Sequence, residues 1–273
     1  ICIARYSGEL ENERFYKLCK RCNHPEICDF HDQIPSACTN CGATLEGLSA
    51  RFLQPKGFLT SAADPDGADP GARRLRSRPV EEARLVTSAP TPAFQTTDVV
   101  GITTAFLPGT RRDDQPLVLG ELFQVNRGPK GFGYLRCPRC EHARPAAKPS
   151  GVAGKEAEHK NPRTGQPCAS TQLGRMVQLG HVFHTDVRQI RLHQPVPEFQ
   201  GHEDPAMAQE SFLRTLVEAF RLAAAGLLEV DLRDIRATWQ LAGSCPDIVL
   251  HDTVTGGAGF VRRIGETIPM SAL

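Results

Sequence analysis

Three pairs of cysteines, each with two residues between its members, constrain the fold of this chain more than any other feature. They are Cys19 and Cys22, Cys38 and Cys41, and Cys137 and Cys140, among ten cysteines in 273 residues. A C-x-x-C turn directs two thiolates at one point about 2.3 Å from a zinc ion, and two such turns complete a tetrahedron. Spacing decides between disulfides and metal in a chain with this many cysteines, and here it favours metal.

The first two pairs predict a zinc ribbon. Fifteen residues separate Cys22 from Cys38, which is a ribbon spacing, and Gly42 follows the last cysteine, where it permits the left-handed backbone of a knuckle turn. A redox dithiol is the alternative, and Cys28 and His31, which lie between the pairs, are alternative ligands. The predicted ligands of the first zinc ion are Cys19, Cys22, Cys38 and Cys41.

The third pair predicts a second zinc site in an inserted knuckle. Cys137 and Cys140 supply two ligands, and His159 and Cys168 complete a Cys3His set. His142 competes for the histidine position, and free thiols are the alternative to a metal. Two zinc ions are therefore the expected cofactors.

The two remaining cysteines, Cys2 and Cys245, have no partner at a useful spacing. Free cysteine is among the most buried residue types and packs as a small hydrophobic group. We therefore predict that both lie in the core.

Charge is distributed unevenly along the chain. The net charge of +1 excludes a uniformly basic nucleic-acid binder. Between Arg127 and Arg163, however, nine Lys or Arg residues face three acidic residues, a local net charge of +6. A basic zinc module suits contacts with DNA phosphates, and a loop kept soluble by its charge is the alternative. The predicted nucleic-acid-binding residues are Arg136, Arg139, Arg144 and Lys148.

The hydropathy pattern predicts an α+β fold with a mixed β-sheet and one main amphipathic helix. Apolar residues recur at helical spacing over residues 207–230. Alternating or β-branched segments predict strands over residues 98–106, 116–125, 179–192, 235–241 and 247–254. The strand over 179–192 changes register near His184, Thr185 and Asp186, which indicates a bulge.

Composition divides the chain into three parts. Residues 1–60 are predicted to form the zinc-ribbon module, and residues 61–79, rich in Pro, Gly, Asp and Arg, a flexible linker. Residues 80–273 form an α/β domain with the zinc-knuckle insertion at 132–170.

No window approaches the ~20 apolar residues that a membrane-spanning helix needs. We expect a cytoplasmic protein without a membrane partner.

A glycine-rich turn follows the last predicted strand and precedes an expected helix start. Its residues Gly256, Gly257 and Gly259 could let backbone amides approach a phosphate, although glycines for a tight turn are the simpler interpretation.

The chain has no Walker A motif, so it should not hydrolyse ATP by itself and is not expected to be an enzyme on its own. Asp186 and Asp252, on separate strands near several histidines, would serve a metal-dependent hydrolase or nuclease if they converged.

Three stretches in order, residues 179–187, 223–231 and 250–263, resemble the MrfA-type zinc-binding domain, a family long described as a domain of unknown function. That family occurs at the C-termini of superfamily 2 DNA helicases and in the DISARM anti-phage protein DrmB. The ribbon and the Cys137 insertion look most like the DrmB arrangement. One departure is clear: the family carries a four-cysteine cluster after the glycine-rich motif, and this chain has no cysteine beyond Cys245.

The resemblance implies a helicase-associated function. It suggests a zinc-stabilised module that binds DNA and a helicase or ATPase subunit within a bacterial anti-phage defence complex. The alternative is that the chain is the accessory C-terminal domain of a superfamily 2 DNA repair helicase. The chain is expected to be a piece of a longer, metal-rich protein.

Overall fold

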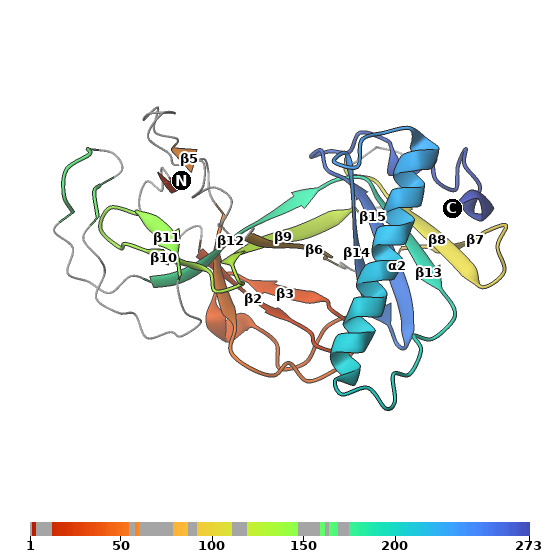
Figure 1. Ribbon diagram of the computed structural model, residues 1–273, viewed down its shortest axis with the longest axis horizontal. Helices are drawn as coiled ribbons and strands as arrows, with labels where there is room; N and C mark the ends of the chain where they lie inside the picture. The colour runs from red at the N-terminus through yellow and green to blue at the C-terminus, as the bar shows by residue number, and fades with distance from the viewer. Residues whose placement is uncertain are drawn as a thin grey trace.

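The structure is a computed structural model, and it describes residues 2–3, 13–54, 58–59, 79–86, 92–110, 119–146, 159–161, 164–168 and 175–273. Two β-sheets follow one another along the long axis of the molecule, and helix α2 (Pro205–Leu228) accompanies the second (Figure 1). The predicted α+β fold with mixed sheets and one main helix is confirmed for the described residues. None of their helices combines the length and the apolar character that crossing a bilayer demands.

The first sheet brings together eight strands from three parts of the sequence. They are β2 (Glu13–Leu18), β3 (Pro25–Cys28), β4 (Ala50–Leu53), β6 (Pro79–Leu85), β9 (Glu121–Pro129), β10 (Tyr134–Arg136), β11 (Ala143–Pro145) and β12 (Arg175–His184). Strand β12 runs parallel to β4, with Leu179 opposite Leu53, and antiparallel to β9. The predicted domain boundary at residue 60 therefore falls between strands of one hydrogen-bonded sheet. A two-stranded ladder pairs β1 (Cys2–Ile3) with β5 (Phe58–Leu59).

Aromatic residues form the core of this sheet. Phe52 and Phe123 are fully buried with ring centroids 4.9 Å apart, and Tyr16 packs against both. Gly180 lies over them on β12, and a Cβ there would come within 2.9 Å of the Phe52 ring. The glycine therefore lets β12 lie close over the two rings.

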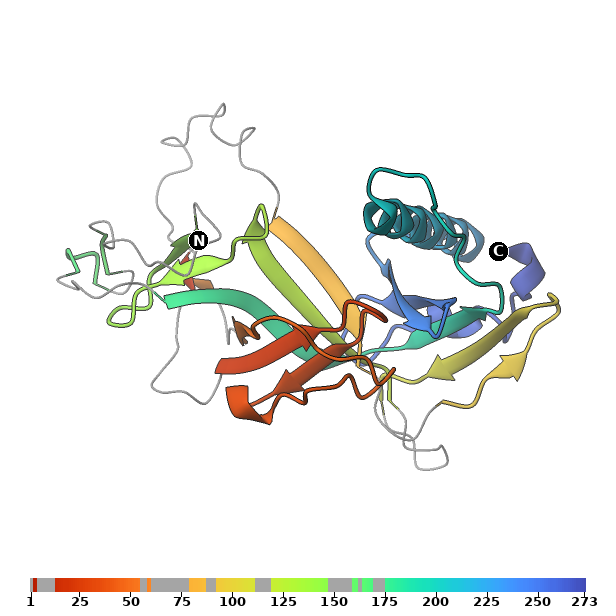
Figure 2. The ribbon, with the colours of Figure 1, turned by 90° about the horizontal axis from the view of Figure 1, so that it is seen from below.

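The second sheet is antiparallel and carries the helix on one face (Figure 2). Its order is β14 (Ile235–Ala242), β15 (Cys245–Asp252), β13 (Val187–Leu192), β8 (Ile102–Leu107) and β7 (Gln95–Thr96). Helix α2 begins at Pro205 behind the Asp204 cap, whose carboxylate accepts from the Met207 amide at 2.9 Å. Its apolar stripe, including Val217 and Leu228, packs against the inner face of the sheet.

The predicted strand over 179–192 is in fact two strands that belong to different sheets. Strand β12 ends at His184 and β13 begins at Val187. Thr185, fully buried between them, places its hydroxyl 2.9 Å and 2.8 Å from the carbonyl oxygens of Asp252 and Val254. The predicted irregularity is in the right place, but it redirects the chain from one sheet to the other.

Polar side chains join the two sheets where they meet. The buried guanidinium of Arg84 on β6 donates to Asn23 Oδ1 at 2.8 Å and to Thr238 Oγ1 at 3.4 Å. Asn23 Nδ2 donates to the carbonyl of Trp239 at 3.0 Å, and Gln240 donates to the carbonyl of Leu85. The ribbon and β6 are thus both fastened to β14.

Three predicted segments differ from the structure. The strand expected over 98–106 begins only at Ile102, because the chain turns at Gly101, where φ is +80°. The strand expected over 116–125 begins at Glu121, and residues 116–118 lie outside the described residues. The helix expected after the glycine-rich turn is a single 3-10 turn, η3 (Val261–Arg263), because Ile264 is extended and Gly265 has a φ of +83°. Two further 3-10 turns are η2 (His31–Gln33) and η4 (Met270–Ala272).

The predicted linker over 61–79 lies outside the described residues except for Pro79, the first residue of β6.

Candidate metal centres

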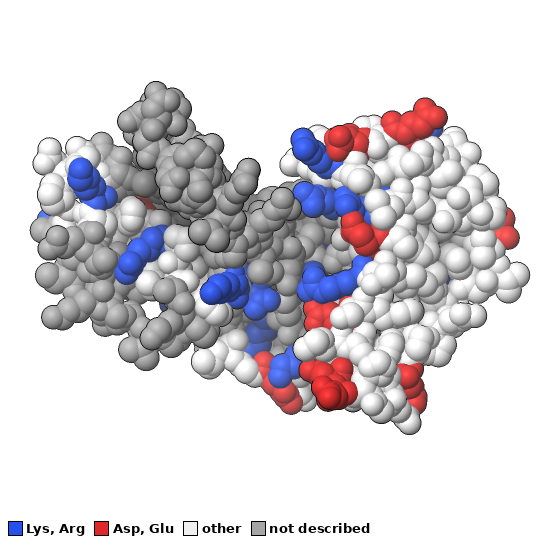
Figure 3. Space-filling view, viewed as in Figure 1, with Lys and Arg blue, Asp and Glu red and all other residues white. Residues whose placement is uncertain are grey.

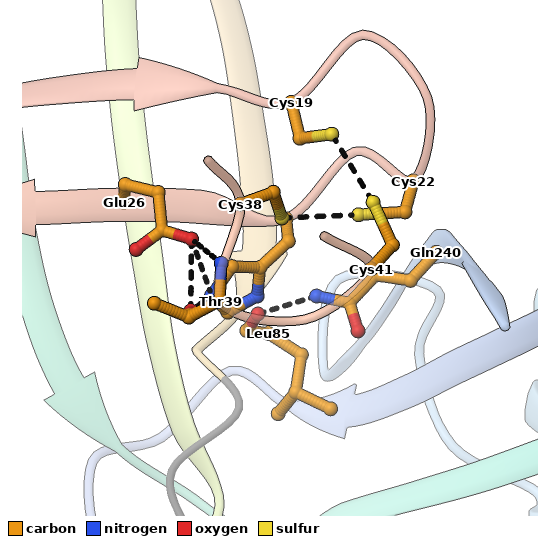
Figure 4. A network of polar contacts seen from close by, with 9 residues as sticks. Cys19, Cys22, Glu26, Cys38, Thr39, Cys41, Leu85 and Gln240 are labelled. Carbon is orange, nitrogen blue, oxygen red and sulfur yellow. Dashed lines mark hydrogen bonds and ion pairs between the residues drawn. The ribbon is translucent and has the colours of Figure 1, made fainter. Parts of the chain in front are cut away.

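The four predicted ribbon ligands converge on one point (Figure 4). Cys19 Sγ lies 3.6 Å from Cys41 Sγ, and Cys22 Sγ lies 3.6 Å from Cys38 Sγ. Around a tetrahedral zinc ion with Zn–S bonds of about 2.3 Å, neighbouring sulfurs are about 3.8 Å apart. The spacing of the thiols therefore fits a metal ion.

Burial disfavours the thiolate form at two positions of this cluster. The Cys22 thiol is 1% exposed, and burial raises its pKa to about 11. Burial also raises the pKa of Cys38. Four crowded thiolates would be unstable in this environment without a positive charge among them. The first group is thus suited to a structural metal ion, and its four soft sulfur ligands are consistent with zinc.

The same knuckle turn is built at all three C-x-x-C pairs. The first cysteine of each pair accepts through its carbonyl from the amide four residues on, at 2.8 Å for Cys19 and Cys38 and 3.0 Å for Cys137. The residue after each second cysteine is left-handed: Asn23, Gly42 and Glu141, with φ of 65°, 71° and 62°. Gly42 correctly predicted a left-handed residue after the second pair, whereas Asn23 and Glu141 adopt the same conformation without being glycine.

The ribbon cluster is part of the core under helix α2. Cys19, Cys22 and Cys38 pack with Leu213 of α2 and Leu241 of β14. Glu26 holds the second knuckle by accepting from the amide and hydroxyl of Thr39 at 2.6 Å and 2.8 Å (Figure 4). Loss of the metal would therefore disturb the second sheet as well as the ribbon.

The second group unites Cys137, Cys140, His159 and Cys168. Cys137 Sγ lies 4.0 Å from Cys168 Sγ, and Cys140 Sγ lies 3.1 Å from His159 Nε2. The competitor His142 instead stacks on His159, with ring centroids 4.9 Å apart and an interplanar angle of 17°. Burial raises the pKa of Cys140 to about 12. The two groups together could hold two metal ions, in agreement with two zinc ions.

The other cysteines and His31 lie outside both groups. Cys28 Sγ donates to the carbonyl of Gln33 at 3.3 Å, and the exposed His31 ring meets Phe15 edge-on. Cys245 is half-buried, so its predicted full burial is wrong: it occupies the first position of β15, beside the turn at Gly243. The Cys2 side chain lies outside the described residues.

The predicted basic residues do not share one environment. Arg136 forms ion pairs of 3.2 Å with Glu13 and with Glu141. Arg144 lies opposite Leu135 in the β10–β11 ladder, so it faces the other side of that hairpin from Arg136. Arg139 is exposed between two metal ligands, and Lys148 lies outside the described residues. Arg21, which is not among the predicted residues, occupies the position equivalent to Arg139 in the first knuckle.

The glycine-rich turn is organised around Asp252. This carboxylate is fully buried and accepts from the amides of Ala258, Phe260 and Val261 at 2.7, 3.1 and 3.1 Å. Burial raises its pKa despite these three donors. The amides of Gly256 and Gly257 also donate within the protein, to the carbonyls of His184 and Val254 at 2.8 and 3.0 Å, as expected for a structural turn.

Asp186 has a related structural role. Its Oδ1 accepts from the Gly109 amide at 2.7 Å, and a Cβ on Gly257 would lie 2.3 Å from its Cγ. Gly257 has a φ of +84°, so both sterics and backbone require glycine there. Within the described ranges, Asp186 and Asp252 belong to no group of three or more potential metal ligands.

His251 on β15 is a buried neutral imidazole. It is 2% exposed, its Nδ1 lies 3.1 Å from the carbonyl oxygen of Asp252, and burial lowers its pKa to about 4. A carbonyl oxygen only accepts, so Nδ1 carries the proton and Nε2 is an acceptor. Within the part of the chain that the structure describes, Nε2 has no hydrogen-bond partner.

Acidification is expected to destabilise the fold through His251. The unfolded histidine binds a proton near pH 6.5, whereas the folded one stays neutral to about pH 4. Stability present above pH 6.5 is therefore lost as the pH falls towards 4, by about 3 kcal/mol. Urea unfolding at pH 7.5, 6, 5 and 4 measures this loss. His251→Phe should flatten the curve by that amount while the exposed-site control His202→Phe should not; equal curves for all three proteins would contradict the assignment.

Comparisons with known proteins give few matches. No family model matches the chain, and no curated protein matches it. Among solved structures, the chain is similar to the crystal structure of the DUF1998 helicase MrfA bound to DNA, with a TM-score of 0.34 and 11% identity over 70% of this chain. It covers 19% of that helicase chain. That helicase belongs to the family that the three sequence motifs resemble.

Proposed function

We propose that this chain is a zinc-stabilised module that binds DNA phosphates and serves a helicase. One observation carries the proposal: two of the three C-x-x-C turns, one in each cluster, present an exposed arginine directly before the second cysteine. These are Arg21 in the ribbon and Arg139 in the inserted knuckle. In the described part of the chain, neither side chain forms an ion pair.

Metal-fixed turns suit arginines that contact phosphate. A knuckle whose two cysteines are held by one ion has little freedom, so its arginine loses less entropy on binding than one on a mobile loop. Guanidinium groups match phosphate oxygens in a bidentate geometry. The electrostatic contribution to such binding does not depend on sequence and falls steeply with salt. The local net charge of +6 between Arg127 and Arg163 would strengthen this electrostatic attraction.

The motif resemblance supports the identity of the host. The sequence has no Walker A motif, so a helicase or ATPase subunit would supply the ATP-driven motor. Within that class we favour an anti-phage defence complex of the DISARM type, because the ribbon and the inserted knuckle together resemble DrmB. The accessory domain of a superfamily 2 repair helicase is the other host.

The proposal predicts salt-dependent DNA binding that requires the knuckle arginines. The double variant Arg21→Ala, Arg139→Ala should weaken binding of a labelled oligonucleotide about tenfold and reduce the slope of log K against log salt by about 2. Fluorescence anisotropy at several salt concentrations measures both, and circular dichroism checks the fold. Arg214→Ala, an exposed arginine on α2, is the matched control. Binding that is absent, or unchanged in the double variant, would contradict the proposal.

A further inference from the structure

A cavity of about 270 Å³ lies where the two sheets meet. One wall comes from the first sheet through Gln124 of β9 and Phe183 of β12. The other comes from the second half through Arg233, Arg236 and His251. Figure 3 shows basic side chains gathered on the side of the α2-bearing half that faces the middle of the molecule. The volume of the cavity is slightly below the range of about 300–1,000 Å³ that is typical of small-molecule sites. The cavity would therefore admit one small group but not a DNA duplex.

The mouth of this cavity attracts an anion. Arg233 and Arg236 are both exposed, and within the described residues neither guanidinium is paired with a carboxylate. The charge of Arg236 also reaches into the cavity, where it helps to keep His251 neutral. Two unpaired guanidinium groups at one opening form a site for a phosphate group.

A hydrogen-bond acceptor without a partner lies at the floor of the cavity. His251 Nε2 is buried, carries a lone pair and has no partner among the described residues. An unsatisfied buried acceptor is rare in folded proteins and costs stability, so it marks a position that a ligand N–H would fill. A bare phosphate dianion has only acceptors there and would leave Nε2 unpaired.

The side wall offers an aromatic ring. Phe183 is half-buried, stacks on His181 with centroids 4.9 Å apart, and meets His251 at 6.5 Å and 70°. Proteins bind nucleobases by packing them on such rings. The two arginines, the aromatic ring and the buried acceptor match the phosphate, the base ring and a base N–H of a nucleotide.

We propose that this cavity binds one nucleotide, with its phosphate on Arg233 and Arg236 and a base N–H on His251 Nε2. This inference rests on the proposed function, because the nucleotide would belong to a bound single strand. A free mononucleotide carries the same chemistry and is the other source. Binding at the cavity adds base contacts to the phosphate contacts of the knuckles.

Fluorescence anisotropy with two labelled strands separates base binding from phosphate binding. One strand is ten deoxycytidines, and the other has the same backbone with abasic residues. The chain should prefer the cytidine strand about tenfold, the size expected when one buried acceptor loses its partner. His251→Phe should abolish most of this preference, whereas Arg236→Ala should weaken binding of both strands. His251→Gln, which keeps an acceptor, should retain part of the preference, and Arg214→Ala should retain all of it.

The outcomes distinguish this inference from the proposed function. Equal affinity for both strands would overturn the nucleotide cavity and leave phosphate binding intact. If neither strand binds, the proposed function fails, and the cavity is then tested with deoxycytidine monophosphate alone by thermal melting. A rise in melting temperature that Arg233→Ala and Arg236→Ala remove would support the cavity. No rise would overturn it, and these exposed arginines can be replaced without disturbing the core.

Discussion

Replacing Cys22 with serine is expected to destabilise the fold by about 4 kcal/mol or more. A structural zinc site supplies folding free energy directly, and loss of one ligand opens it. Cys22 packs in the cluster that includes Leu213 and Leu241, and its carbonyl accepts from the Leu241 amide at 3.1 Å. The loss should therefore spread from the ribbon to helix α2. Urea unfolding followed by circular dichroism, with zinc per chain counted by atomic absorption, measures both effects.

A matched control lies in the same ribbon. Cys28→Ser changes the same atom outside the metal group, and its hydroxyl can still donate to the Gln33 carbonyl. It should keep two zinc ions per chain and lose less than about 1 kcal/mol. If Cys22→Ser also retains two zinc ions and full stability, the ribbon thiols do not hold a metal ion.

Replacing Asp252 with alanine should destabilise the protein by about 3–5 kcal/mol, because three backbone amides lose their acceptor together. The amides of Ala258, Phe260 and Val261 all point at this buried carboxylate. The turn that it organises also carries Gly257 against Asp186. Thermal or urea unfolding gives the change in free energy.

Two variants sharpen this second prediction. Asp252→Asn keeps one acceptor oxygen and the same shape, so it should lose roughly half as much stability. Asp234→Ala changes an aspartate whose carbonyl, rather than its carboxylate, accepts from Thr253, so it should cost little. If Asp252→Ala is as stable as Asp234→Ala, the three amides find other partners and the carboxylate has no organising role.

The cysteine pairs of the two candidate metal sites were predictable from the sequence because local spacing brings the members of each pair together. A C-x-x-C turn closes on itself, so Cys19 and Cys22 meet wherever the rest of the chain goes. His159 was harder, because His142 lies closer to Cys140 in the sequence, and only the ring stacking in the structure separates them.

Contacts between distant segments were not predictable. Nothing in residues 50–53 indicates that they pair in parallel with β12, or that β12 and β13 enter different sheets. The cavity shows the same limit: Arg236 and His251 lie on neighbouring strands, but Phe183 reaches them only through the meeting of two sheets. Hydropathy within a window carries no information about such pairings.

The parallel pairing of β4 with β12 has a consequence for the order of folding. During synthesis β4 leaves the ribosome long before β12, so its edge stays open while the intervening strands are made. Long-range pairings of this kind form slowly, and an open edge invites association with other chains. The ribbon can bind zinc early, because its four cysteines all lie between residues 19 and 41. Early metal loading would thus hold β2, β3 and β4 together as a template until the last strand of their sheet arrives.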